Sequence, residues 1–222
     1  MNINQQLREN RVLPLATITS KEEVDGISHA LLKANCSVLE ITLRDERVRK
    51  ILHLFKDHPD LTIVLGTIRS SEDIDLAVSS GVCFGITPGL SKTLCKYAKD
   101  SNFQLIPGVQ TASEIMLASE LGYKLLKFFP AELSGGSKKL KAMQAVFPDI
   151  SFVPTGGVNS SNFDSYLALN NVVCVGSSDL ISNEMLINND WNGISSNIIN
   201  ICLLYTSPSP RDVEESRMPS SA

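Results

Sequence analysis

The feature that most constrains the fold is the alternation of short apolar runs with helix-like segments along the 222 residues. The apolar runs recur roughly every 20 to 27 residues, as the strands of a repeated β/α unit would. The eight predicted strands are Val12–Ile18, Val38–Thr42, Thr62–Gly66, Cys83–Thr87, Gln104–Pro107, Lys124–Phe129, Ser151–Thr155 and Val172–Gly176. Strands that alternate with helices pair in parallel, and eight such units favour closure of the sheet. The sequence therefore predicts an α/β fold, a single-domain (β/α)8 TIM barrel with a short leading helix over residues 2–10.

An open, doubly wound parallel sheet is the alternative architecture. Its dinucleotide-binding version carries Gly-x-Gly-x-x-Gly after a strand, and this chain has no such motif. The helical segments between the predicted strands have their own start signals. Ser20–Glu23 and Thr111–Glu114 are capping boxes, and Ser70 with Asp73 is a weaker version.

Charge and composition exclude several classes of partner. The net charge of -4 and the lack of a basic run argue against nucleic acid. No apolar run approaches the ~18 residues of a membrane span, and the first residues lack the apolar core of a signal peptide. The five cysteines form no close pairs, which predicts reduced thiols in a cytoplasmic protein. Cys83, Cys95 and Cys174 are expected to fill the core, and no His, Asp and Glu set has the spacing of metal ligands.

The end of the chain differs from the rest. Cys202–Asp212 resembles the in-frame translation of a common short-read sequencing adapter, and Ser216–Ala222 resembles the translated far end of the same segment. We therefore interpret residues 1–201 as the folded domain, with its last helix truncated, and residues 202–222 as a non-native, disordered tail. A natural disordered tail rich in serine and proline is the alternative.

One lysine lies inside a predicted buried strand. Lys127 follows Leu125 and Leu126 and precedes Phe128 and Phe129. Lysine is rarely buried without a reason. Apolar surroundings favour the neutral amine, which is the form that attacks a carbonyl to give a Schiff base. In the alternative interpretation, Lys127 extends from the strand end to water and has no chemical role.

A second predicted strand carries three polar side chains on one face. Alternation along the strand places Glu40, Thr42 and Arg44 inward, with Leu39 and Ile41 against the helices. A carboxylate, a hydroxyl and a guanidinium in one inward row are costly to bury unless they serve a site. A structural ion pair between Glu40 and Arg44 is the alternative.

Other polar or small residues fall at the carboxyl ends of predicted strands, where barrel enzymes place their active sites. Thr67 follows the third strand. Thr155-Gly156-Gly157 ends the seventh strand, and Gly176-Ser177-Ser178 ends the eighth. Bare N–H groups near helix starts suit an anion, so the two clusters together predict a phosphate site. Each cluster alone would more often be a plain turn.

Seven motifs in chain order resemble the 2-keto-3-deoxy-6-phosphogluconate aldolase family, which also includes 4-hydroxy-2-oxoglutarate aldolases. The motifs are Leu39–Arg44, Gly66-Thr67, Pro88–Leu90, Ile106–Gly108, Lys127–Glu132, Pro154–Val158 and Val175–Ser178. The resemblance runs from Arg11 to Leu180. It implies a class I aldolase on a (β/α)8 barrel that needs no cofactor or metal, binds a small keto acid and forms a homotrimer.

The resemblance also implies roles for individual residues. Lys127 would form the Schiff base, and Glu40 would be the general acid and base. The implied substrate-binding residues are Arg44, Thr67, Pro88 and Thr155, and the implied phosphate-binding residues are Gly156, Gly157 and Ser178. Arg44 and Thr67 would hold the pyruvate carboxylate, and Thr155 would lie near the hydroxyl of the fourth substrate carbon.

The chain departs from the family pattern in several places. Val64-Leu65 replaces small residues before Gly66, and Thr17 stands where many relatives carry an arginine near the phosphate. Ser177 replaces a common glycine, and Asp179 replaces an apolar residue. An acidic side chain that points into a phosphate site repels the ligand. These changes leave the lysine chemistry intact and bear on the identity of the substrate.

The main functional prediction is reversible cleavage of 2-keto-3-deoxy-6-phosphogluconate to pyruvate and glyceraldehyde 3-phosphate, a step of the Entner-Doudoroff pathway. The first alternative is a 4-hydroxy-2-oxoglutarate aldolase, which releases pyruvate and glyoxylate. The second is a non-catalytic barrel that binds phosphosugars, in which the Lys127, Glu40 and Arg44 set would have no purpose.

Overall fold

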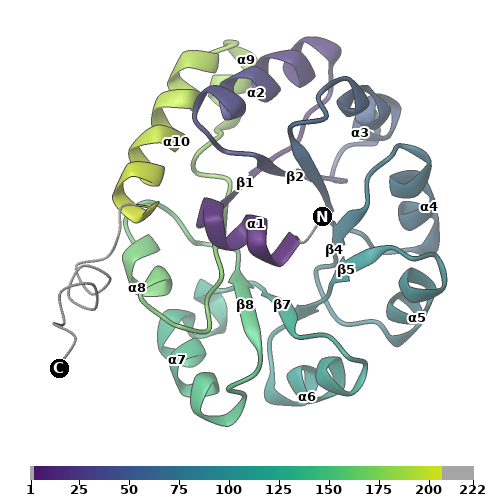
Figure 1. Ribbon diagram of the computed structural model, residues 1–222, viewed down its shortest axis with the longest axis vertical. Coiled ribbons are helices and arrows are strands. Elements are labelled where there is room, and N and C mark those ends of the chain that lie inside the picture. The colour runs from purple at the N-terminus through teal and green to yellow at the C-terminus, as the bar shows by residue number, and fades with distance from the viewer. Residues whose placement is uncertain (1–2, 207–222) are drawn as a thin grey trace, which may run out of the picture.

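The computed structural model describes residues 3–206, in which strands and helices alternate (Figure 1). The strands are β1 (Val12–Ala16), β2 (Val38–Thr42), β3 (Thr62–Gly66), β4 (Phe84–Ile86), β5 (Gln104–Ile106), β6 (Gly108–Val109), β7 (Leu125–Phe128), β8 (Ser151–Pro154) and β9 (Val175–Ser177). Each predicted strand position overlaps an observed strand, and β2 and β3 have the predicted bounds. The short strand β6 is not among the predicted strands.

The helices lie between the strands and at both ends of the described range. The α-helices are α1 (Ile3–Asn10), α2 (Lys21–Lys33), α3 (Glu46–Ile51), α4 (Ser71–Ser79), α5 (Lys92–Asp100), α6 (Ala112–Glu120), α7 (Gly136–Val146), α8 (Phe163–Leu167), α9 (Asn183–Ile187) and α10 (Trp191–Thr206). Two short 3-10 helices, η1 (Leu52–Asp57) and η2 (Glu132–Ser134), complete the described elements.

The predicted helix starts are present. Full capping boxes form at Ser70 with Asp73 and at Thr111 with Glu114. At the start of α2, the Ser20 hydroxyl accepts a hydrogen bond from the Glu23 amide, while the Glu23 carboxylate bonds the Thr19 amide. These contacts satisfy helix N–H groups that have no partner within the helix.

The predicted closed eight-stranded barrel is wrong, because the strands form two separate parallel sheets. The larger sheet has six strands in the order β5-β4-β3-β2-β1-β9, and the smaller has three in the order β6-β7-β8. Pro107 separates β5 from β6 and has no N–H to donate to a ladder. Between β8 and β9 the pairing consists of single bridges, Phe152 with Val172 and Thr155 with Gly176. The hydrogen-bonded ladder is thus interrupted on both sides of the small sheet.

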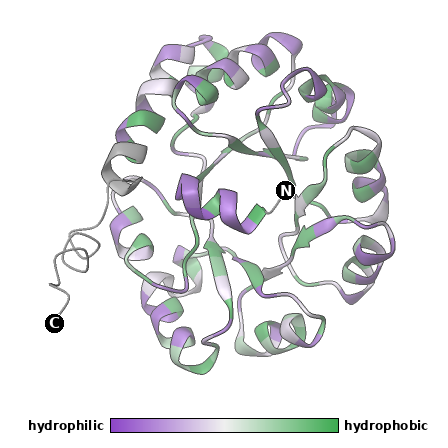
Figure 2. Cartoon of the chain, viewed as in Figure 1, coloured by the Kyte–Doolittle hydropathy of each residue, from purple (hydrophilic) through white to green (hydrophobic). Residues whose placement is uncertain are grey.

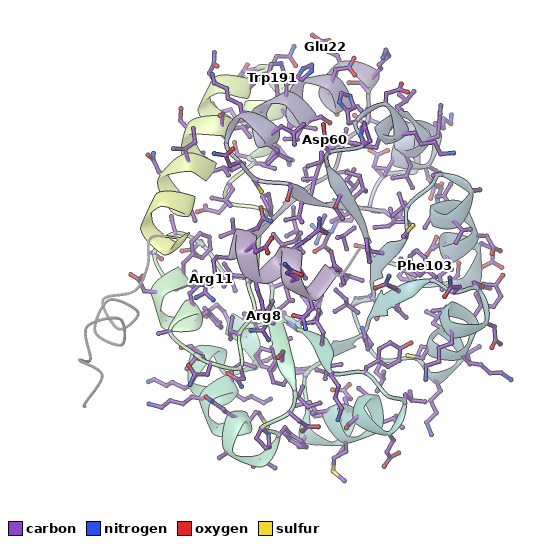
Figure 3. The ribbon with its side chains drawn as sticks, in the orientation of Figure 1. Arg8, Arg11, Glu22, Asp60, Phe103 and Trp191 are labelled. Atoms are coloured by element: carbon purple, nitrogen blue, oxygen red, sulfur yellow. The ribbon has the colours of Figure 1, made fainter. Side chains whose placement is uncertain are left out.

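The leading helix α1 crosses the amino ends of the strands, at the centre of Figure 1. The Gln6 amide donates to the hydroxyl of Thr62 at the start of β3, over 3.1 Å. Arg8, labelled in Figure 3, donates to the hydroxyl of Ser151 at the start of β8, over 3.2 Å. Leu7 is fully buried beneath the helix. Because this end is covered, the opposite, carboxyl end of the strands is the open one.

The other helices surround the strands (Figure 1), and polar and apolar residues alternate along them (Figure 2). Helices α10 and α2 pack against each other, with Trp191 of α10 over Gly26 of α2; Trp191 and Glu22 are labelled close together in Figure 3. A Cβ atom at Gly26 would lie 2.2 Å from the indole ring. Within residues 3–206, no helix combines the length and the apolar character that crossing a membrane requires.

Helix α10 continues through residues 202–206, the first part of the predicted non-native tail. Residues 207–222 lie outside the described residues. The division of the chain at residue 201 stays a prediction.

Candidate active site

The centre of the candidate site is a contact between a lysine and a glutamate from facing strands. Lys127 on β7 and Glu40 on β2 meet with 3.2 Å between Nζ and Oε1. Their side chains are 7% and 1% exposed. The amine is therefore enclosed beside an acid and does not extend to bulk water.

The neighbours of Lys127 have the predicted alternation. Leu126 and Phe128 are fully buried on the other face of β7. The Lys127 nitrogen lies 5.2 Å from the centroid of the Phe129 ring. The nitrogen therefore lies between an aromatic face and a carboxylate.

Glu40 keeps one oxygen available. Oε1 accepts the hydrogen bond from Lys127, while Oε2 is buried and has no partner among the described residues. A buried carboxylate oxygen without a partner is costly. It is also the position at which a substrate hydroxyl or a water molecule can bind.

The space for Glu40 depends on a glycine. A Cβ atom at Gly66, at the carboxyl end of β3, would lie 2.3 Å from Glu40 Oε1 and 2.8 Å from its Cγ. A side chain at this position would displace the carboxylate. This role of Gly66 was not predicted from the sequence, although a glycine in a strand is a known sign of close backbone approach.

Arg44 takes no part in the contact between Lys127 and Glu40. Its side chain is exposed just beyond β2, and among the described residues no ion pair joins it to Glu40. It lines a cavity of about 310 Å³ together with Thr17, Thr42 and Ser178. The Thr17 and Thr42 hydroxyls lie 2.7 Å apart in this cavity. Lys127 and Glu40 are not part of its lining, so the structure groups the predicted residues into a buried pair and an open, polar cavity.

The two threonines of the implied substrate set lie at strand ends. Thr67 follows β3 with φ 64°, a left-handed backbone that is unfavourable for a β-branched residue. Such strain is found preferentially at functional sites. Thr155 is buried beyond β8, and a Cβ atom at Gly176 would lie 2.3 Å from its hydroxyl oxygen. Pro88 is exposed in the loop after β4.

The predicted phosphate loops have the expected backbone freedom. Gly156 and Gly157 have φ of 97° and 77°, which only glycine adopts at low cost. Ser178 is exposed in the loop after β9. The loop at Gly157 packs on Glu132, because a Cβ atom there would lie 2.8 Å from the Glu132 Cβ.

Glu132 is in turn held by a buried tyrosine. The Tyr166 hydroxyl of α8 donates a hydrogen bond to the Glu132 carboxylate. Burial, and then this bond, raise the pKa of Tyr166 above its ordinary value. The hydroxyl therefore remains a donor at neutral pH, and it anchors η2 against the glycine loop.

None of the cysteines whose side chains the structure describes contacts Lys127 or Glu40. Cys95 and Cys174 are buried as predicted, and burial raises the pKa of both thiols. Cys83 is exposed, so the expectation that it fills the core is wrong. Among residues 3–206, no cluster of three or more His, Cys, Asp or Glu side chains is placed to hold a metal ion.

A lysine amine enclosed with a carboxylate between parallel strands is suited to carbonyl chemistry, because an amine can form a Schiff base and an acid can move protons. A family model described as aldolase, KDPG and KHG aldolase, matches residues 3–197. The chain therefore belongs to the KDPG and KHG aldolase family, as the sequence motifs predicted, and is a lyase.

Individual relatives cover most of the chain. A 2-dehydro-3-deoxy-phosphogluconate aldolase of Pseudomonas aeruginosa is 41% identical over 190 residues, 85% of this chain and 86% of the relative. A KHG/KDPG aldolase of Escherichia coli is 37% identical over 185 residues, 83% of this chain and 87% of the relative. The crystal structure of KDPG aldolase from Legionella pneumophila, with pyruvate captured as a covalent carbinolamine intermediate, has a TM-score of 0.87. It is 36% identical and covers 90% of this chain and 98% of that chain.

Proposed function

We propose that this aldolase reversibly cleaves 2-keto-3-deoxy-6-phosphogluconate to pyruvate and glyceraldehyde 3-phosphate through a Schiff base on Lys127. The observation that carries the proposal is the enclosed contact of Lys127 Nζ with Glu40 Oε1. The name of the Pseudomonas relative and the pyruvate carbinolamine of the Legionella relative support the substrate and the covalent step.

The first stage is attachment of the keto acid. Glu40 accepts a proton from the Lys127 ammonium across the 3.2 Å contact, which frees the nitrogen lone pair. The neutral amine attacks the keto carbon and forms a carbinolamine. Glu40 then returns its proton to the hydroxyl of the carbinolamine, which leaves as water, and an iminium remains.

The second stage is cleavage of the bond between the third and fourth carbons. The Glu40 carboxylate removes the proton of the hydroxyl on the fourth carbon, and the bonding electrons move toward the iminium. The aldehyde leaves and an enamine of pyruvate stays on Lys127. Glu40 returns the proton to the third carbon, and water hydrolyses the resulting iminium. General acid–base help of this kind contributes about 10²–10⁴-fold.

The remaining predicted residues would bind the rest of the substrate. Arg44 is suited to a carboxylate because its planar guanidinium can make two parallel contacts. Thr67 and Thr155 would contact the substrate carboxylate and hydroxyl. The loops that carry Gly156, Gly157 and Ser178 would bind the phosphate.

A second candidate function is cleavage of 4-hydroxy-2-oxoglutarate to pyruvate and glyoxylate. The polar cavity favours it, because Thr17 and Thr42 present hydroxyls there instead of additional positive charge, which suits a terminal carboxylate better than a phosphate dianion. The KHG/KDPG name of the Escherichia coli relative supports it as well. Comparing turnover of phosphorylated and unphosphorylated substrates separates the two functions.

We further infer a cytoplasmic homotrimer. The free thiols of Cys83, Cys95 and Cys174 support a reducing compartment, and the family resemblance supports the trimer. Light scattering coupled to size-exclusion chromatography tests the assembly, and a monomer at enzyme assay concentration would contradict it.

Trapping of the covalent intermediate tests the mechanism directly. Incubation with pyruvate and borohydride reduces the iminium to a stable secondary amine. We expect a mass gain of one reduced pyruvate, located on Lys127 by peptide mapping. Folded protein that gains no such mass, or gains it at another lysine, would contradict the proposal.

A further inference from the structure

Side chains at the end of β9 and in the loop after it tie the two predicted phosphate segments together. Ser177 Oγ donates to the Val158 carbonyl over 2.7 Å. Asp179 Oδ2 accepts from both the amide and the hydroxyl of Ser160, over 3.1 and 3.0 Å. Three hydrogen bonds therefore join the loop after β8 to the end of β9 and the residues that follow it.

One of these bonds consumes a donor that an anion could use. The Ser160 amide belongs to the loop that begins at Gly156 and Gly157, where bare N–H groups were predicted to bind phosphate. The Asp179 carboxylate already satisfies this amide. Asp179 also follows Ser178 directly, so a negative side chain borders the predicted phosphate position.

The adjoining cavity offers little positive charge in return. Among the described residues that line it, Arg44 is the only cation, and Thr17, Thr42 and Ser178 contribute hydroxyls. Arg44 is already proposed to bind the substrate carboxylate. Asp179 does not line the cavity, but its carboxylate contacts Ser160 in the adjoining predicted phosphate loop. The terminal carboxylate of 4-hydroxy-2-oxoglutarate carries one negative charge and would be repelled less than a phosphate dianion.

We propose that Asp179 is a specificity-determining residue that weakens binding of a terminal phosphate and so favours turnover of unphosphorylated 2-keto-4-hydroxy acids relative to phosphorylated ones. The proposal rests on the aldolase function proposed above. Asp179 acts on the ligand's charge and does not take part in the lysine chemistry. Because its side chain is exposed, water and salt screen the repulsion, and the effect is moderate.

The test is the substitution Asp179→Asn, which keeps an oxygen that can accept from Ser160 and removes the charge. We expect kcat/KM for 2-keto-3-deoxy-6-phosphogluconate to rise about three- to tenfold, the size of a screened repulsion between a unit charge and a phosphate. For 4-hydroxy-2-oxoglutarate, whose terminal carboxylate carries a single negative charge, we expect a smaller rise of about two- to threefold. Inorganic phosphate, used as a competitive inhibitor of that second reaction, should bind more tightly by the same three- to tenfold factor.

The matched control is Asp164→Asn, which makes the same charge change on exposed residue 164 of α8 and should leave the substrate ratio unaltered. An unchanged ratio in Asp179→Asn, an equal change for both substrates, or a loss of phosphorylated turnover would each overturn the proposal. The wild-type enzyme distinguishes failure of this proposal from failure of the aldolase function. If wild type releases pyruvate from neither substrate, the aldolase function is refuted.

Discussion

The substitution Gly66→Ala tests whether the position of the Glu40 carboxylate matters. The new methyl group would start 2.3 Å from Glu40 Oε1. The carboxylate would have to move by about 1 Å to reach ordinary contact distance, and a displacement of that size at a reacting group can cost about 10²-fold in rate. This loss corresponds to about 2.7 kcal/mol of transition-state stabilisation. Crowding of the buried site should also reduce the free energy of unfolding by about 1–3 kcal/mol.

The assay is pyruvate release followed by a coupled dehydrogenase, with urea unfolding measured in parallel. Gly89→Ala is the matched control, because a Cβ atom at Gly89 meets nothing within 4 Å and its φ is not in the left-handed region. We expect this variant to keep wild-type activity.

A double-mutant cycle with Glu40→Gln locates the cause of the loss. If Gly66→Ala acts through the carboxylate, it should cost little further activity in a chain that already lacks the Glu40 charge. A folded Gly66→Ala protein with wild-type kcat would refute the reasoning. So would a full additional loss in the Glu40→Gln background.

Two further predictions concern stability. Tyr166→Phe removes the hydroxyl that donates to Glu132 and should lower the free energy of unfolding by about 1–2 kcal/mol, measured in urea; an unchanged midpoint would contradict the anchoring role. The Arg47 side chain, and then its amide, lower the pKa of Asp45 to about 2. The stabilisation from the ionised Asp45 should therefore be complete above its unfolded pKa of about 3.9 and disappear as the pH falls toward 2. The stability difference between wild type and Asp45→Asn, measured by urea unfolding at several pH values, should shrink over that range, and a constant difference would refute the assignment.

Much of the scaffold could be predicted because burial in parallel strands leaves a strong local signal. The apolar runs at Val38–Thr42 and Thr62–Gly66 match β2 and β3. Lys127 and Glu40 stood out as charged residues within apolar runs, and the structure brings them into contact. Closure of the sheet could not be predicted from such runs. It depends on whether neighbouring backbones supply donors, and Pro107 and Pro154 supply none.

The details of the site depended on contacts between distant segments. The need for Gly66 beside Glu40 follows from the register of β2 against β3, which the residue pattern does not specify. The bond from Ser160 to Asp179 joins two loops 19 residues apart. The sequence indicated that Asp179 was unusual for the family, but only the structure identifies its partner.

The packing of Trp191 on Gly26 gives the chain a built-in optical reporter. Trp191 is the sole tryptophan, and it lies at the junction of α10 and α2, whereas Lys127 and Glu40 lie on β7 and β2. Its fluorescence should therefore follow detachment of the final helix. Comparing that signal with pyruvate release during denaturation would show whether catalysis survives after α10 has separated from α2.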